Sequence, residues 1–214
     1  MRVTSITVGP FRENCWILHE PALDEVVLVD PGDEADRIVA AVAATGARLT
    51  DVVLTHAHLD HVGALAGVRR AWPGVPVHMH PAEAPVFDFA PRAAALYGLP
   101  FERSAPPERE IVEGQVLRLA GESFEVWHLP GHAPGHVAFI GAGMAFGGDV
   151  LFAGSVGRTD LPLSDPSALD RSLRRLLTLP GETVVHPGHG PSTTMAEEAR
   201  SNPFLNGSAL VPGR

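Results

Sequence analysis

The chain has 214 residues, 45% of them hydrophobic, and a formal net charge of −9 with sixteen basic residues, all arginine. This length suits one sizeable domain or two small ones, and the acidic balance argues against nucleic-acid binding, which depends on clustered basic side chains. No apolar run reaches the roughly 18 residues that span a bilayer and no secretory signal is visible, so we expect a cytoplasmic protein that binds no membrane.

The first half of the chain alternates strand and helix patterns. Alternating or continuous apolar runs predict strands at 2–8, 14–19, 25–30, 52–54 and 75–80. Helical spacing of apolar residues predicts helices at 34–45 and 62–72, and an alanine-rich composition predicts a helix at 82–98 with interruptions at Pro85 and Pro91. The only cysteine, Cys15, lies in a strand pattern, where a buried thiol is expected rather than a nucleophile.

The second half of the chain is richer in strands. They are predicted at 116–119, 124–128, 137–140, 144–146 and 183–185. Asp165 and Pro166 predict the start of a helix with a leucine stripe, and a last helix is predicted at 194–205. No linker, repeat or low-complexity tract divides the chain. We therefore expect residues 1–214 to form a single domain of antiparallel-rich strand groups covered by helices.

Titratable side chains are concentrated directly after the strand predicted at 52–54. Residues 55–61 read T-H-A-H-L-D-H and place His56, His58, Asp60 and His61 within one short segment, close to the N-terminus of the next helix. His56 and His58 are two apart on an extended segment and so face the same way. These four side chains would crowd and repel one another unless a cation lay between them. The cluster therefore indicates a metal site.

Three later loops carry the same residue types. They read P-G-H-A-P-G-H at 130–136, G-G-D-V at 147–150 and H-P-G-H-G-P at 186–191. Loops at one edge of a sheet converge in space, and imidazole with carboxylate suits borderline divalent ions. The other histidines are interpreted as strand or loop residues, with His136 supporting its neighbour His132; they are His19, His78, His80, His128, His136 and His186.

The pattern H-x-H-x-D-H, followed by single H, D and H ligands, resembles the dinuclear site of the metallo-β-lactamase fold. The resemblance implies that His56, His58 and His132 hold one metal. It further implies that Asp60, His61 and His189 hold a second and that Asp149 bridges both. The implied fold is α+β, a four-layer αββα sandwich with the site at one edge of the two sheets.

Further stretches resemble the glyoxalase II (hydroxyacylglutathione hydrolase) branch, particularly its short bacterial members. They are Asn14-Cys15, 29–32, 157–160, 188–191 and 202–205. This likeness implies hydrolysis of a small-molecule thioester of the S-lactoylglutathione type by a hydroxide that bridges two divalent ions, with Asp60 and Asp149 orienting it. Zinc is the expected metal, and the ligand set also accepts iron or manganese. The pattern indicates no particular oligomeric state.

The sequence departs from full-length glyoxalase II where glutathione is held. Only nine residues follow Leu205, so the C-terminal helical extension is not expected. Arg158 keeps a basic residue for the substrate, whereas Asp160 and Pro191 stand where tyrosines are expected. We therefore expect Arg158 to contact substrate and the glutathione carrier to be weakly recognised.

Other functions are compatible with parts of the pattern. A persulfide dioxygenase with one iron would use His56, His132 and Asp149 as a facial triad, although the second-metal ligands are all present and Leu161-Pro162 departs from the aromatic residue expected there. A common β-lactamase would need a cysteine ligand, and a phosphodiesterase would need a basic surface. A non-catalytic metal-binding protein of the same fold typically lacks ligands that this chain keeps.

Overall fold

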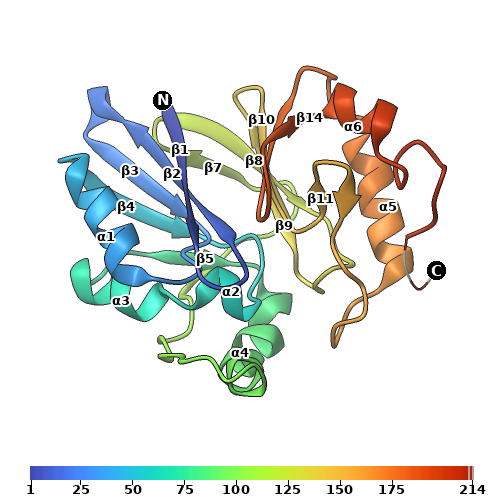
Figure 1. Cartoon of the computed structure of the whole chain (residues 1–214). Helices are drawn as coiled ribbons and strands as arrows, with labels where there is room; N and C mark the ends of the chain where they lie inside the picture. Colours follow the sequence, from blue (N-terminus) through green and yellow to red (C-terminus); the bar gives the residue numbers. More distant parts are fainter. Residues whose placement is uncertain (212, 214) are drawn as a thin grey trace.

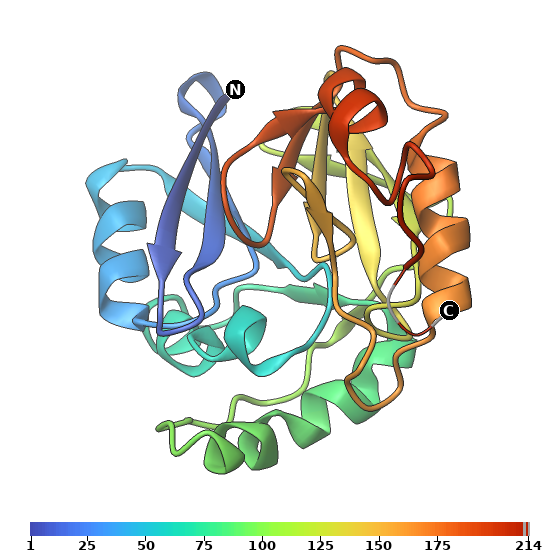
Figure 2. The same cartoon turned by 45° about the vertical axis from the view of Figure 1, so that its right-hand side comes forward.

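Two six-stranded sheets face each other, and helices cover the outer face of each (Figure 1). The computed structural model describes residues 1–211 and residue 213. In Figure 2 the blue-to-teal first half lies beside the yellow-to-red second half, and the green helix α4 (Ala84–Leu96) runs beneath both.

The first sheet has the order β1-β2-β3-β4-β5-β6. Its strands are Arg2–Val8, Glu13–Glu20, Glu25–Val29, Arg48–Val53, Val77–Met79 and Arg109–Glu110. The pairs β1/β2 and β2/β3 are antiparallel. The pairs from β3 to β6 are parallel, because the chain returns between these strands through helices: α1 (Ala35–Ala44), α3 (Leu65–Ala71) and α4.

The second sheet has the order β14-β13-β10-β9-β8-β7. In chain order its strands are Val116–Leu119, Glu122–His128, Val137–Gly141, Met144–Gly148, Val184–Pro187 and Thr193–Thr194. All its pairs are antiparallel except β10/β13, which α5 (Pro166–Leu176) connects. A two-stranded sheet, β11 (Leu151–Phe152) and β12 (Ser155–Val156), precedes α5, and α6 (Met195–Ser201) follows β14.

Alternating side chains divide the core into three layers of contact. On β2, Cys15 and Ile17 pack with the helices on the first sheet, whereas Trp16 and Leu18 pack between the sheets. The third cluster joins the outer face of the second sheet to Leu169 and its neighbours on α5. Each sheet thus buries both faces, which confirms the predicted four-layer αββα sandwich.

Several predicted boundaries differ from the observed ones. The helix predicted at 62–72 is two pieces, α2 (Leu59–Val62) and α3, because the Ala64 amide donates to the Pro31 carbonyl instead of continuing the helix. The last helix ends at Ser201, before Asn202 and Pro203. The strands β6, β11, β12 and β14 have two residues each, too few to show a periodicity.

The helix predicted at 82–98 is preceded by a 3-10 turn, Pro81–Glu83, and is observed as α4 at Ala84–Leu96. Pro85 lies in its first turn, where a missing amide hydrogen is tolerated, and Pro91 lies inside it. A second 3-10 turn, Pro21–Leu23, joins β2 to β3. No helix within the described residues is long and apolar enough to cross a membrane.

Candidate metal centre

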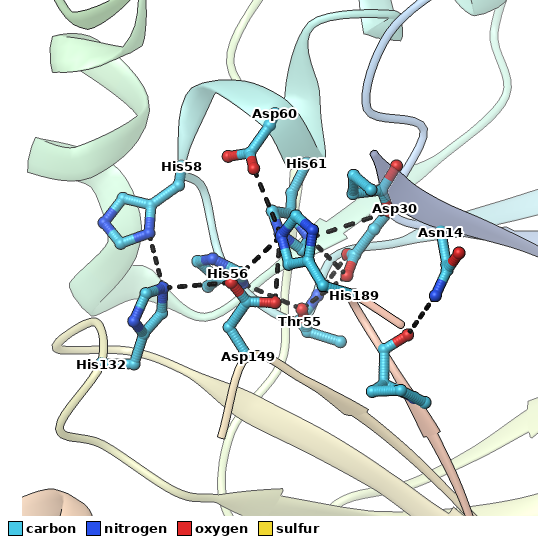
Figure 3. Close-up of polar contacts among 12 residues, drawn as sticks. Asn14, Asp30, Thr55, His56, His58, Asp60, His61, His132, Asp149 and His189 are labelled. Carbon is cyan, nitrogen blue, oxygen red and sulfur yellow. Dashed lines mark hydrogen bonds and ion pairs between the residues drawn. The ribbon is translucent and has the colours of Figure 1, made fainter. Parts of the chain in front are cut away.

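All seven side chains that the sequence predicts as ligands come together where four loops meet at one edge of the sheets (Figure 3). The loop after β4 and the short helix α2 supply His56, His58, Asp60 and His61. The second sheet supplies the other three from the loops after β8, β10 and β13: His132, Asp149 and His189.

His56, His58 and His132 form the first group. Their candidate donor atoms all lie within 4.8 Å of one another. His58 Nδ1 lies 2.9 Å from His132 Nε2, and His56 Nε2 is buried without a hydrogen-bond partner among the described residues. Because an unpartnered buried nitrogen is costly, three imidazoles aimed at one point fit a metal ion.

Asp60, His61 and His189 form the second group, again with donor atoms within 4.8 Å. His189 Nε2 lies 3.4 Å from an Asp60 oxygen. Within the part of the chain that the structure describes, the buried His61 Nε2 has no hydrogen-bond partner, although Asp149 Oδ1 is 3.4 Å away. This donor set of two imidazoles and one carboxylate also fits a divalent ion.

Asp149 lies between the two groups. Its Oδ2 is 3.5 Å from His132 Nε2 and 3.4 Å from His189 Nε2, and its Oδ1 faces His61. Burial acts to raise the pKa of Asp149, but His61, His189 and His132 outweigh it and hold that pKa well below the usual value. The carboxylate is therefore ionised and reaches both groups, as a bridging ligand must.

Four of the five imidazoles are oriented by a hydrogen bond at the nitrogen that faces away from the centre. The Nδ1 partners are Thr55 Oγ1 for His56, Asp30 Oδ2 for His61, the Arg158 carbonyl for His132 and the Phe11 carbonyl for His189. Such contacts fix the ring and leave Nε2 free to bind. They also fix which nitrogen each histidine offers.

Asp30 is a residue whose role the sequence did not reveal. It lies close to His56 and His61, but its oxygens already accept from the Thr55 amide at 2.7 Å and the Thr55 hydroxyl at 2.6 Å, besides His61 Nδ1. It therefore orients His61 rather than completing a third metal group. The sequence feature that could have pointed to Asp30 is its position at the end of an apolar strand, directly before Pro31 and Gly32.

Two further buried groups hold the ligand loops together. Glu83 accepts from the amides of Ala57, at 2.8 Å, and Gly135, at 2.7 Å, and so joins the loops that carry His58 and His132. His136 Nε2 accepts from the Asp149 amide at 3.0 Å, consistent with its predicted supporting role. Glu83 gave no sequence signal, because an acidic residue at a helix start is common.

Burial keeps the first group uncharged. It lowers the pKa of His56 well below its usual value and that of His58 to about 3. At His189 burial also opposes protonation, but hydrogen bonds to Asp149 and Asp60 outweigh it and raise the pKa to about 9. Neutral imidazole is the form that binds a metal, so a metal entering the second group displaces a proton.

A pocket of about 570 Å³ opens onto the centre. Arg158 lies on its wall, but its guanidinium is paired with Asp160 through bonds of 2.6 and 2.7 Å and also contacts Tyr97. Tyr97, the chain's single tyrosine, comes from the end of α4 and packs edge-on against Phe11. The sequence gave no signal that this tyrosine approaches the site.

A family profile described as the metallo-β-lactamase superfamily matches residues 8–189. The chain belongs to this superfamily. Among its members, hydroxyacylglutathione hydrolase GloC of Haemophilus influenzae is 39% identical, over 96% of this chain and 99% of that protein. The predicted fold and family, with the likeness to hydroxyacylglutathione hydrolases, are thereby confirmed.

Solved metallo-β-lactamase-fold structures agree closely with this one. TTHA1623, determined in a di-iron-bound form, has a TM-score of 0.87 at 48% identity and covers 94% of this chain and 100% of its own. The B3 metallo-β-lactamase BLEG-1 has a TM-score of 0.86 at 34% identity and covers 95% and 99%. The chain is therefore a member of a superfamily of metal-binding hydrolases. Its own predicted His and Asp ligands lie together at one edge of the sheets.

Proposed function

We propose that the protein is a dinuclear metallohydrolase that cleaves a small-molecule thioester of the S-lactoylglutathione type. The observation that carries this proposal is the position of Asp149 between the two groups. Its Oδ1 faces His61 of the second group, and its Oδ2 faces both His132 of the first group and His189 of the second. The likeness to a hydroxyacylglutathione hydrolase and to a di-iron-bound structure supports it.

The residues divide the work of holding metal and orienting water. His56, His58 and His132 would hold one ion and Asp60, His61 and His189 the other, with Asp149 shared. Two bound divalent ions would supply a nucleophilic water at neutral pH and polarise the thioester carbonyl. Asp60 and Asp149 would accept hydrogen bonds from that water and orient it, while Asp30 holds the His61 ring in place.

The leaving group needs little help from the protein. A thiol has a pKa of about 8.5, so a thiolate departs near neutral pH without a strong general acid. No dedicated proton donor to the sulfur is required, in keeping with a pocket wall whose polar residues are mostly ligand candidates. We expect zinc at both positions, with iron or manganese as substitutes that the same donors accept.

The test is to measure metal content and activity on the same preparation of native protein. We expect two metal ions per chain and hydrolysis of S-lactoylglutathione and of a simpler thioester, with thiol release as the readout. Oxygen uptake with glutathione persulfide by protein containing one iron would instead identify a dioxygenase. Hydrolysis of a β-lactam alone would identify a lactamase. Two bound metals without turnover of any of these would favour a non-catalytic metal-binding protein.

A further inference from the structure

The pocket above the metal centre is mostly apolar. Five of its lining residues are ligand candidates, and among the others only Tyr97, Ser155 and Arg158 carry a polar side-chain group. The volume of about 570 Å³ is in the range of pockets that enclose a small organic molecule. The ligand candidates thus line the floor of the pocket, and mainly apolar side chains line its walls.

Separate segments of the chain supply these apolar walls. The helix α4 contributes Val86, Phe89 and Ala93, and the loop before α5 contributes Leu161 and Leu163. Leu163 is 58% exposed, and Leu96 at the end of α4 is 74% exposed. Single exposed apolar residues are common, but two that face one opening beside a catalytic centre favour an apolar ligand.

The positively charged side chain on the pocket wall, Arg158, already has an anionic partner. Asp160 binds the Arg158 guanidinium at two positions, and Tyr97 also contacts it. The remaining acidic groups at the pocket, Asp60 and Asp149, repel anions unless metal neutralises them. Glutathione carries two carboxylates, and the lining residues that the structure describes include no second arginine or lysine to receive them.

We propose that this pocket binds the apolar acyl chain of the thioester and that acyl-chain length, more than the glutathione carrier, determines the substrate. This rests on the proposed thioesterase function and names the substrate class within it. Each methylene moved from water onto an apolar wall should raise kcat/KM about threefold to fourfold. The relevant wall is the α4 face that carries Phe89.

The experiment uses metal-loaded enzyme and acetyl, butyryl, hexanoyl and octanoyl thioesters of N-acetylcysteamine, a small uncharged carrier. We expect kcat/KM to rise about thirtyfold or more from acetyl to octanoyl, even if only half of the added methylenes are buried. Phe89→Ala should reduce the octanoyl-to-acetyl ratio several-fold. Val116→Ala, which truncates an exposed apolar side chain on β7 that does not line the pocket, should leave the ratio unchanged.

A binding measurement separates this proposal from the proposed function. S-alkyl thioethers of N-acetylcysteamine lack the scissile carbonyl, so their Kd, measured by calorimetry, does not depend on turnover. A Kd that falls with chain length in the wild-type protein, and less steeply in Phe89→Ala, supports the apolar site even if no thioester is hydrolysed. A Kd independent of chain length overturns it, even if S-lactoylglutathione is a good substrate.

Discussion

At the residue scale, Asp149 is the side chain that faces both groups of ligand candidates. Asp149→Asn keeps the shape of the side chain but removes its negative charge. Both ions should therefore bind more weakly, and activity should fall about a hundredfold or more. Metal analysis after dialysis against metal-free buffer, with kcat/KM on the same sample, checks this. His19→Ala, which replaces a histidine outside the centre, is the control and should retain both metals.

His189 belongs to only one group, and its substitution distinguishes one site from two. Its contacts at the centre are with Asp60 and Asp149, so His189→Ala should empty mainly the second position and leave about one ion per chain. Metal stoichiometry by mass spectrometry measures the result. Unchanged metal content together with unchanged activity would show that the dinuclear assignment is wrong.

Arg158 tests recognition of the carrier. Because Asp160 already occupies two of its donors, Arg158→Ala should lower kcat/KM for S-lactoylglutathione by about tenfold or less and should not affect an uncharged N-acetylcysteamine thioester. Arg174→Ala, which breaks an exposed ion pair with Asp170 on α5, serves as the matched control. Equal losses for both thioesters would mean that Arg158 acts on the centre and not on the carrier.

The ligand candidates could be predicted from sequence because they are dense and of few chemical types. Four occur within residues 55–61, and the others lie in loops that repeat the same pattern. Asp30, Glu83 and Tyr97 could not be assigned roles, since their partners lie 25 or more residues away in the chain. Their function depends on tertiary contacts that local patterns do not encode.

At the element scale, long strands with clear alternation were predictable and short segments were not. β1 was predicted with its observed bounds, Arg2–Val8, because it alternates over seven residues. The break between α2 and α3 depends on the bond from Ala64 to Pro31, which belongs to a distant loop. Likewise, the alanine-rich composition predicts a helix at 82–98, observed as α4 at Ala84–Leu96, but not that one of its faces lines the pocket.

The loop after β8 is held close to α5, and Gly131 makes that approach possible. Its φ is +137°, and an added Cβ would lie 2.2 Å from the Leu169 backbone nitrogen. Gly131→Ala should therefore cost about 3 kcal/mol or more in the free energy of unfolding and displace the adjacent His132. Gly74→Ala, at φ +85° with open space around it, should cost only about 1–2 kcal/mol. Urea unfolding compares the two, and equal costs would contradict the close approach.

Glu83 joins two ligand loops and makes stability depend on pH. Burial raises its pKa from 4.5 to about 7, so between these values the folded protein keeps a proton that the unfolded chain releases. Its contribution to the free energy of unfolding therefore falls as pH rises through this window and is constant above it. Because Glu83→Gln cannot titrate, the stability advantage of the wild type over the variant should shrink by about 2–3 kcal/mol between pH 5 and pH 8. Urea unfolding of metal-free protein measures it; an advantage independent of pH would mean that Glu83 is already ionised when folded.

At the scale of the whole molecule, the metal centre lies where the two sheets meet. The first sheet contributes His56, His58, Asp60 and His61, and the loops of the second contribute the other three ligand candidates. Each metal group therefore takes residues from both sheets. A bound ion would join the two halves of the sandwich in addition to the apolar core between them.

Metal removal should consequently lower thermal stability as well as activity. An ion present at about a hundred times its Kd stabilises the folded state by about 2.7 kcal/mol, which for a chain of this size corresponds to about 5–10 °C in Tm per occupied site. Scanning calorimetry of native, chelator-treated and zinc-reconstituted protein gives the comparison, with metal content measured on each sample. His189→Ala, expected to hold one ion, should show about half of the wild-type shift. If chelation removes the metal and leaves Tm unchanged, then the ions do not hold the two sheets together, and their role is confined to the chemistry at the pocket floor.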